Sequence, residues 1–131
     1  MKKIAVGAAI LFLLAHTAGV FAQTPKLMIF GDIDHRAYLG CLNCSQYESD
    51  SVYNQYGNYG SSYSADSIFN QYSEYGSPYS NESACNPYAN DPPVIVDQDG
   101  QFYGRLTLNA YHPQASNNET LLQWLAIVCR H

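Results

Sequence analysis

Residues 45–60 read SQYESDSVYNQYGNYG, and residues 61–76 read SSYSADSIFNQYSEYG. A third copy, SPYSNESACNPYA, fills residues 77–89. Tyrosine, serine, asparagine and glycine return at fixed places in each copy. Matches of this density at a fixed spacing indicate an internal repeat with a unit of 16 residues, as in the segment 45–60.

The period continues into the flanking sequence. A shift by four repeat units places YLGCLNCSQY at 38–47 on FYGRLTLNAY at 102–111. Each segment completes a β-hairpin pattern: Val94–Val96, a tight turn at Asp99-Gly100 and residues 102–108 in the second, and residues 26–30 with 37–42 in the first. Gly40 and Gly104 stand inside the returning strands, where glycine is typical of a bulge or a close backbone contact.

The C-terminal segment predicts one helix. Asn117 or Asn118 can cap it, and Glu119 falls in the first turn, where a carboxylate suits the helix dipole. The apolar run that follows, residues 121–128, has apolar side chains on nearly every side, so we expect the helix to be largely buried. It is too short to cross a bilayer.

These elements predict a small α+β domain. Two related hairpins form an antiparallel sheet, the tyrosine-rich 16-residue repeats lie against it as short turns and single-turn helices, and the C-terminal helix closes the core. The alternative is a short solenoid in which each unit is one coil. A continuous ladder of equivalent strands would decide for the solenoid.

Residues 1–22 read as a secretory signal peptide. Lys2 and Lys3 precede an apolar run, and Val20-Phe21-Ala22 fits a signal-peptidase site. We expect residues 23–131 to form a single mature domain that is secreted or periplasmic, with no membrane span.

The charge of the mature segment excludes one class of partner. It has four Lys or Arg residues against eleven Asp or Glu residues, and residues 45–91 contain no Lys or Arg. Nucleic-acid binding needs a basic surface to neutralise phosphates, so we expect none. Cations, neutral sugars and basic proteins are compatible partners.

All four cysteines, Cys41, Cys44, Cys85 and Cys129, lie in the mature segment. An exported chain meets an oxidising compartment, so disulfides are expected, with three pairings possible. The C-x-x-C at 41–44 also fits zinc or redox chemistry, but no second pair of soft ligands follows at zinc spacing.

The motifs resemble a group of uncharacterised bacterial secreted proteins. The resemblance rests on L-G-x-L-N at 39–43, the serial D-S-[VI]-x-N-x-Y-G units, N-P-Y-A at 86–89 and P-P-V-I-V-D-x-D-G-x-F-Y-G at 92–104. It covers residues 37–111 and implies no activity. In such relatives L-G-C-L-N-C is a self-contained feature and the place of Cys85 holds an aromatic or small residue. The resemblance therefore implies bridges Cys41–Cys44 and Cys85–Cys129.

Tyrosine is the main candidate for binding, because its flat ring and hydroxyl suit sugars or protein partners. The glycine-flanked residues are the predicted site: Tyr56, Tyr59, Tyr72 and Tyr75. Tyr47, Tyr63 and Tyr79 are expected instead to pack with Val52 and Ile68 in a core that is poor in aliphatic residues.

The repeated acid-serine pairs, such as Asp50-Ser51 and Asp66-Ser67, are expected to cap single helical turns. Calcium coordination is the alternative, but calcium loops cluster more acids than one per unit. Asp32-Ile33-Asp34 and Asp97–Gly100 resemble fragments of cation loops and equally suit hairpin turns. We expect no metal site and no cofactor.

We therefore expect a non-catalytic interaction module that presents acidic, tyrosine-rich loops to a glycan, an envelope component or a protein. One alternative is a small hydrolase or metal-dependent enzyme, in which His35 or His112 meets Asp32, Asp34, Asp97 or Asp99 in a cleft. The sequence contains no hydrolase, zinc-protease or phosphate-loop motif. The other alternative is a purely structural repeat protein.

Overall fold

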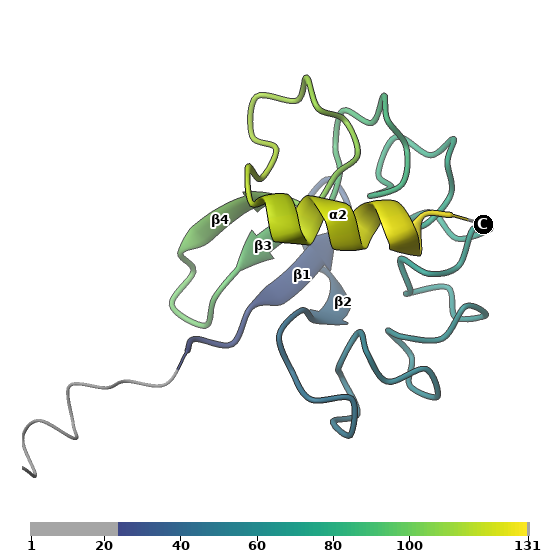
Figure 1. The fold of residues 1–131 in the computed structure, drawn as a ribbon, viewed down its shortest axis with the longest axis vertical. Coiled ribbons are helices and arrows are strands. Elements are labelled where there is room, and N and C mark those ends of the chain that lie inside the picture. The colour runs from purple at the N-terminus through teal and green to yellow at the C-terminus, as the bar shows by residue number, and fades with distance from the viewer. Residues whose placement is uncertain (1–23, 131) are drawn as a thin grey trace, which may run out of the picture.

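The computed structural model describes residues 24–130, so the predicted signal peptide at 1–22 lies outside the described residues. Within this range the chain forms four strands and one helix (Figure 1). These are β1 (Met28–Gly31), β2 (Ala37–Cys41), β3 (Val94–Val96), β4 (Phe102–Arg105) and α2 (Glu119–Val128). The helix crosses one face of the sheet, and the repeats coil beside it (Figure 1).

The sheet joins the two predicted hairpins edge to edge in the order β2-β1-β3-β4. All its pairings are antiparallel, and β1 pairs with β3 through Met28↔Val96, Ile29↔Ile95 and Phe30↔Val94. The predicted α+β fold is thus confirmed. Inside the repeats no ladder of equivalent strands appears among the described residues, so the criterion for the solenoid is not met.

Both hairpins are irregular at their predicted glycines. The register shifts within each hairpin, and Gly40 and Gly104 have positive φ values of 108° and 99°. Positive φ is the region that glycine enters at little cost. A Cβ on Gly40 would lie 2.6 Å from the Cβ of Tyr59, so the strand also depends on a close approach there.

The residues that follow these glycines repeat the same contacts. Cys41 N–H donates to the Asp50 carbonyl at 2.7 Å, and Arg105 N–H donates to the Gln114 carbonyl at 2.8 Å. The carbonyl of Cys41 then accepts from Val52 N–H, as the carbonyl of Arg105 does from Ser116 N–H, both at 3.0 Å. The four-unit shift read from the sequence therefore relates two equivalent structural units.

The repeats form consecutive turns that begin three residues apart, with one step of four residues in a unit, from Gly57 to Ser61 and from Ser73 to Ser77. Asn70 N–H donates to the Ser67 carbonyl at 3.3 Å, and Ser73 N–H donates to the Asn70 carbonyl at 3.0 Å. The Ser67 hydroxyl also accepts from Phe69 N–H at 3.1 Å. Serine and asparagine favour such turns because their side chains bond the backbone two residues on. The expectation of single-turn helices here was wrong, because residues 45–89 contain turns and bends and no helical residue.

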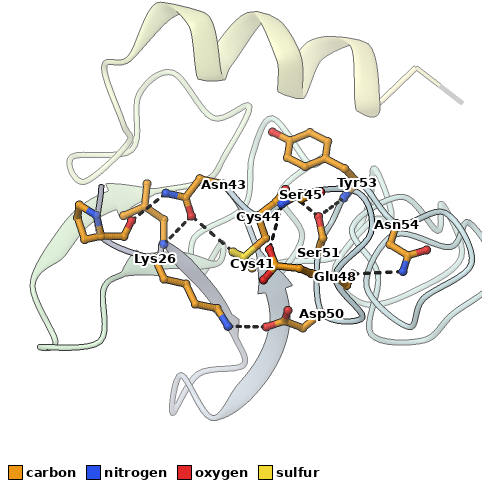
Figure 2. Close-up of a disulfide and its surroundings, with 12 residues drawn as sticks. Lys26, Cys41, Asn43, Cys44, Ser45, Glu48, Asp50, Ser51, Tyr53 and Asn54 are labelled. Carbon is orange, nitrogen blue, oxygen red and sulfur yellow. Dashed lines mark hydrogen bonds and ion pairs between the residues drawn. A yellow bond between two sulfur atoms is a disulfide. The ribbon is translucent and has the colours of Figure 1, made fainter. Parts of the chain in front are cut away.

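The asparagines of the repeats also brace one turn against another. The side-chain amides of Asn54, Asn70 and Asn86 donate to the carbonyls six residues earlier, at 3.2, 3.0 and 2.9 Å. Figure 2 shows the bond of Asn54 to the carbonyl of Glu48. A segment with little regular secondary structure thereby satisfies its backbone groups locally.

Each repeat gives one aliphatic side chain to the core: Val52, Ile68 and Ala84. They pack with residues of the sheet and with Leu125 of α2. Leu125 is the one buried residue of α2, and Ile127 is 65% exposed, so the expectation of a largely buried helix was wrong. One stripe of α2 faces the core, and its other side faces solvent.

Two features fix the ends of α2. The Asn118 side chain caps its N-terminus by accepting from Leu121 N–H at 3.2 Å. At its C-terminus the Cys85–Cys129 disulfide ties it to the third repeat. The second disulfide joins Cys41 to Cys44 at the end of β2 (Figure 2), so both pairings implied by the resemblance are present.

Candidate functional site

The four tyrosines predicted to bind lie in two different environments. Tyr56 and Tyr72 are exposed, whereas Tyr59 and Tyr75 are partly buried. Tyr59 packs edge-on against Tyr38 with ring centroids 5.0 Å apart, and Tyr75 packs against the hydrophobic core. The four rings are therefore not displayed together.

The tyrosines expected in the core lie on the surface instead. Tyr47, Tyr63 and Tyr79 are exposed, so that expectation was wrong. Each of these tyrosines is the third residue of a turn and its ring points outward, whereas the residue after the buried serine of each unit points inward. The sequence interpretation did not include this three-residue spacing, so it did not predict on which side of the chain each tyrosine lies.

Seven tyrosines share one exposed position, the third residue of a turn. Each is 84–96% exposed, and each backbone N–H donates to a serine or asparagine side chain two residues earlier. They are Tyr47, Tyr56, Tyr63, Tyr72, Tyr79, Tyr88 and Tyr111. Because the backbone beneath these rings is already ordered, a ligand that stacks on them immobilises little besides the ring itself.

An aromatic groove lies between the first two repeats and α2. It has a volume of about 740 Å³, and Trp124 of α2 forms one wall. Trp124 contacts Phe69 edge-on, with ring centroids 6.1 Å apart. Tyr56 and Tyr63 line the groove as well and bring two of the seven exposed rings to it.

A ridge divides this groove from a second hollow of about 520 Å³ along α2. The ridge consists of Tyr53 and Trp124, whose ring centroids are 5.8 Å apart, and both residues line both hollows. Figure 2 shows the Tyr53 ring pointing from the first repeat toward α2. Its backbone N–H donates to the Ser51 hydroxyl at 3.0 Å, and that hydroxyl donates to the Cys44 carbonyl.

No Asp, Glu, Lys or Arg lines either hollow among the described residues. The polar groups present are hydroxyls and amides, including those of Gln55, Ser61 and Ser62 in the groove and Asn117 in the second hollow. Flat aromatic walls with uncharged donors and acceptors suit a neutral, hydroxyl-rich ligand.

The sequence reading did not single out Trp124. Two signals were available: it is the only tryptophan of the chain, and an aromatic residue occupies the same repeat position at Tyr53 and Phe69. That these three rings meet depends on how α2 docks, which no local pattern reveals.

The histidines do not form the arrangement that the hydrolase alternative requires. His112 uses both ring nitrogens on the backbone: Nε2 lies 2.9 Å from the Asn90 carbonyl, and Nδ1 accepts from Gln114 N–H. His35 lines a hollow on the outer side of the sheet that contains no Asp or Glu among its described residues. Neither histidine meets an acid in a cleft within residues 24–130.

The predicted cation-loop fragment at Asp97 serves the hairpin. Its carboxylate accepts from Asp99 N–H, Gln101 N–H and the Tyr103 hydroxyl at 2.9, 3.0 and 2.9 Å. Burial alone would raise the pKa of Asp97, but these hydrogen bonds outweigh it and lower the pKa. The carboxylate is thus committed to the turn.

A separate cluster of carboxyl groups gathers where the second and third repeats meet the turn after β1. Glu74, Glu82 and Asp32 line a shallow hollow there. A hydrogen bond with Glu74, burial and the charges of Glu74 and Asp32 raise the pKa of Glu82 to about 7. In residues 24–130 no group of three or more His, Cys, Asp or Glu side chains is placed to hold a metal ion.

None of the described helices is long and apolar enough to span a membrane. Comparison of the chain with known protein families, with curated proteins and with solved structures gives no match. The geometry of the aromatic groove is therefore the main evidence for function.

Proposed function

We propose that the protein is a non-catalytic interaction module, exported from the cell, whose aromatic groove binds a neutral glycan. The observation that carries the proposal is the meeting of Trp124 with Tyr53 and Phe69 beside the exposed rings of Tyr56 and Tyr63. Sugar rings present flat C–H faces that stack on aromatic side chains, and their hydroxyls bond to amides and hydroxyls. The two disulfides are compatible with an oxidising compartment.

The charge distribution supports a neutral ligand over an acidic one. Five acidic residues of the repeats, Glu48, Asp66, Glu74, Glu82 and Asp91, form no ion pair with the described residues. They surround the tyrosines with negative potential, which disfavours acidic polymers. A glycan also fits the groove better than a protein does. The groove is lined by uncharged polar groups, so a charged side chain of a protein would find no ion-pair partner there.

Trp124 provides a direct measurement, because it is the only tryptophan of the chain. The oxidised mature protein would first be sedimented with insoluble cellulose, chitin or peptidoglycan sacculi. It would then be titrated with soluble oligosaccharides of the polymer that carries it into the pellet. Occupation of the groove should change the tryptophan emission. If the protein sediments with none of these polysaccharides and the tryptophan emission stays constant, the proposal is wrong.

Matched variants then locate the site. Tyr63→Ala removes an exposed ring at the groove and should weaken binding about tenfold, ~1.4 kcal/mol. Tyr111→Ala removes an equally exposed ring on the same kind of turn, outside the residues that line the groove, and should leave affinity unchanged. Equal losses in both variants would contradict a site at the groove.

A further inference from the structure

The outer face of the sheet, opposite α2, carries a row of aromatic and aliphatic side chains. Strand residues alternate between faces, so Ile29, Leu39 and Ile95 face the core while their neighbours face outward. The register places apolar outward residues of neighbouring strands opposite each other, Phe30 opposite Tyr38 and Val94, and Val96 opposite Phe102. They are Phe30 of β1, Val94 and Val96 of β3 and Phe102 of β4, and Tyr38 of β2 ends the row where Tyr59 and Asp50 of the same chain contact it.

This outer face is hollowed and partly exposed to solvent. Phe30, Val94, Val96 and Phe102 line a hollow of about 350 Å³, and Phe102 is 46% exposed. The rings of Phe30 and Tyr38 contact each other with centroids 5.3 Å apart. These apolar side chains thus lie on the face of the sheet opposite the core cluster and opposite α2 (Figure 1).

Positive charge without an acidic partner borders the same face. Arg105 lines the hollow, and its guanidinium donates to the Gln114 side chain and the Pro92 carbonyl, both at 2.8 Å and both neutral. Arg36 is exposed in the turn that leads into β2. The one ion pair within residues 24–130 joins Lys26 to Asp50, so neither arginine is neutralised by a described acid.

The repeats of the same chain have the complementary properties. Residues 45–91 contain six acids and no Lys or Arg, and they display six of the seven exposed tyrosines. A face that combines an apolar row with arginines fits a surface that combines tyrosines with carboxylates, because rings fill the hollow while opposite charges meet at its rim.

We propose that the outer sheet face binds the acidic, tyrosine-rich repeats of a second copy of this chain, head to tail. The two surfaces differ, so each copy keeps one of each after pairing. A heterologous contact of this kind adds further copies, in contrast to a two-fold contact, which closes at a dimer. The mature proteins would then form short chains in which the repeats of each copy meet the sheet face of the next.

Sedimentation velocity of the oxidised mature protein, without any glycan, tests the association. The weight-average mass should rise with concentration at low salt and fall back toward the monomer at high salt, because the charges that meet are exposed. Phe102→Asp should weaken association at least about tenfold, since it places a carboxylate in the apolar row. Arg130→Glu, a charge reversal at the end of the chain, should associate as the wild type does.

Mixing two variants distinguishes head-to-tail contacts from other arrangements. Phe102→Asp disables the sheet face, and the double variant Glu48→Gln/Asp66→Asn weakens the repeat face without removing any tyrosine. Each alone should stay largely monomeric, while the mixture should form heterodimers through its remaining intact pair of faces. A wild-type monomer at every concentration and salt would overturn the proposal, as would a mixture without heterodimers. Near-ultraviolet circular dichroism confirms that each variant is folded.

Discussion

Gly40 and Gly104 lie in different hairpins and hold the same position in each, with a positive φ inside the returning strand. The residue after each glycine then bonds a segment further along the chain, which produces two isolated parallel bridges, Cys41↔Ser51 and Arg105↔Ala115. The glycines therefore turn the chain out of the sheet and into the turns.

Gly40→Ala should destabilise the domain strongly. Its φ of 108° is unfavourable for alanine, and the new Cβ would lie 2.6 Å from Tyr59 Cβ and 3.0 Å from the Asp50 carbonyl. We expect the free energy of unfolding in urea to fall by about 3 kcal/mol. Gly100→Ala is the control, because its φ is 81° but nothing lies within 4 Å, and it should cost about 1 kcal/mol. Equal costs would show that the contact with Tyr59 contributes nothing.

Asn70→Ala tests the bracing of the turns. Its side chain accepts from Tyr72 N–H and donates to the Ser64 carbonyl, both at 3.0 Å, so alanine leaves two backbone groups without their partner. We expect a loss of about 1–3 kcal/mol in urea unfolding. Asn58→Ala is the matched control, because Asn58 is exposed and makes no side-chain hydrogen bond with the described residues; its cost should be near zero. A neutral result for Asn70→Ala would mean that water replaces both bonds.

The sheet and its bulges could be predicted because their signals are local. A β-branched run, a tight Asp99-Gly100 turn and a glycine in each returning strand define a hairpin whatever packs on it. The helix was predicted for the same reason, from its cap and its apolar run.

Which tyrosines of the repeats face solvent could not be predicted from amphipathic patterns. Consecutive turns follow neither the strand period of two nor the helix period of 3.6, so hydrophobicity did not show which tyrosines face solvent. The information was present in a different form, as runs of serine and asparagine spaced three residues apart within a unit, for example Ser61, Ser64, Ser67 and Asn70. The groove at Trp124 depends on the docking of α2, a contact distant in sequence, and lay beyond such patterns.

The two disulfides should contribute unequally to stability. Cys85–Cys129 spans a sequence separation of 44 and holds α2 against the third repeat, whereas Cys41–Cys44 spans 3. Loop-closure entropy predicts a cost of about 4 kcal/mol for Cys85→Ala/Cys129→Ala and about 2 kcal/mol for Cys41→Ala/Cys44→Ala. Thermal unfolding of both double variants measures the difference. Because α2 carries Trp124, the first variant should also weaken glycan binding, and the second should not. A larger loss from the short bridge would contradict this assignment.

Glu82 should make the domain less stable as the pH rises toward neutrality. Its hydrogen bond with Glu74, its burial and the nearby carboxylates raise its pKa from the usual 4.5 to about 7. A carboxyl group whose pKa is raised on folding stabilises the fold fully below its unfolded pKa, and this contribution is lost as pH rises through the folded pKa. Urea unfolding between about pH 4.5 and 7 should therefore show falling stability, by less than ~1.4 kcal/mol per pH unit for this one proton, because solvent screens the cluster.

Glu82→Gln should flatten that decline, while Glu119→Gln, outside the cluster, should preserve it. An unchanged slope in Glu82→Gln would show that another group titrates in this range.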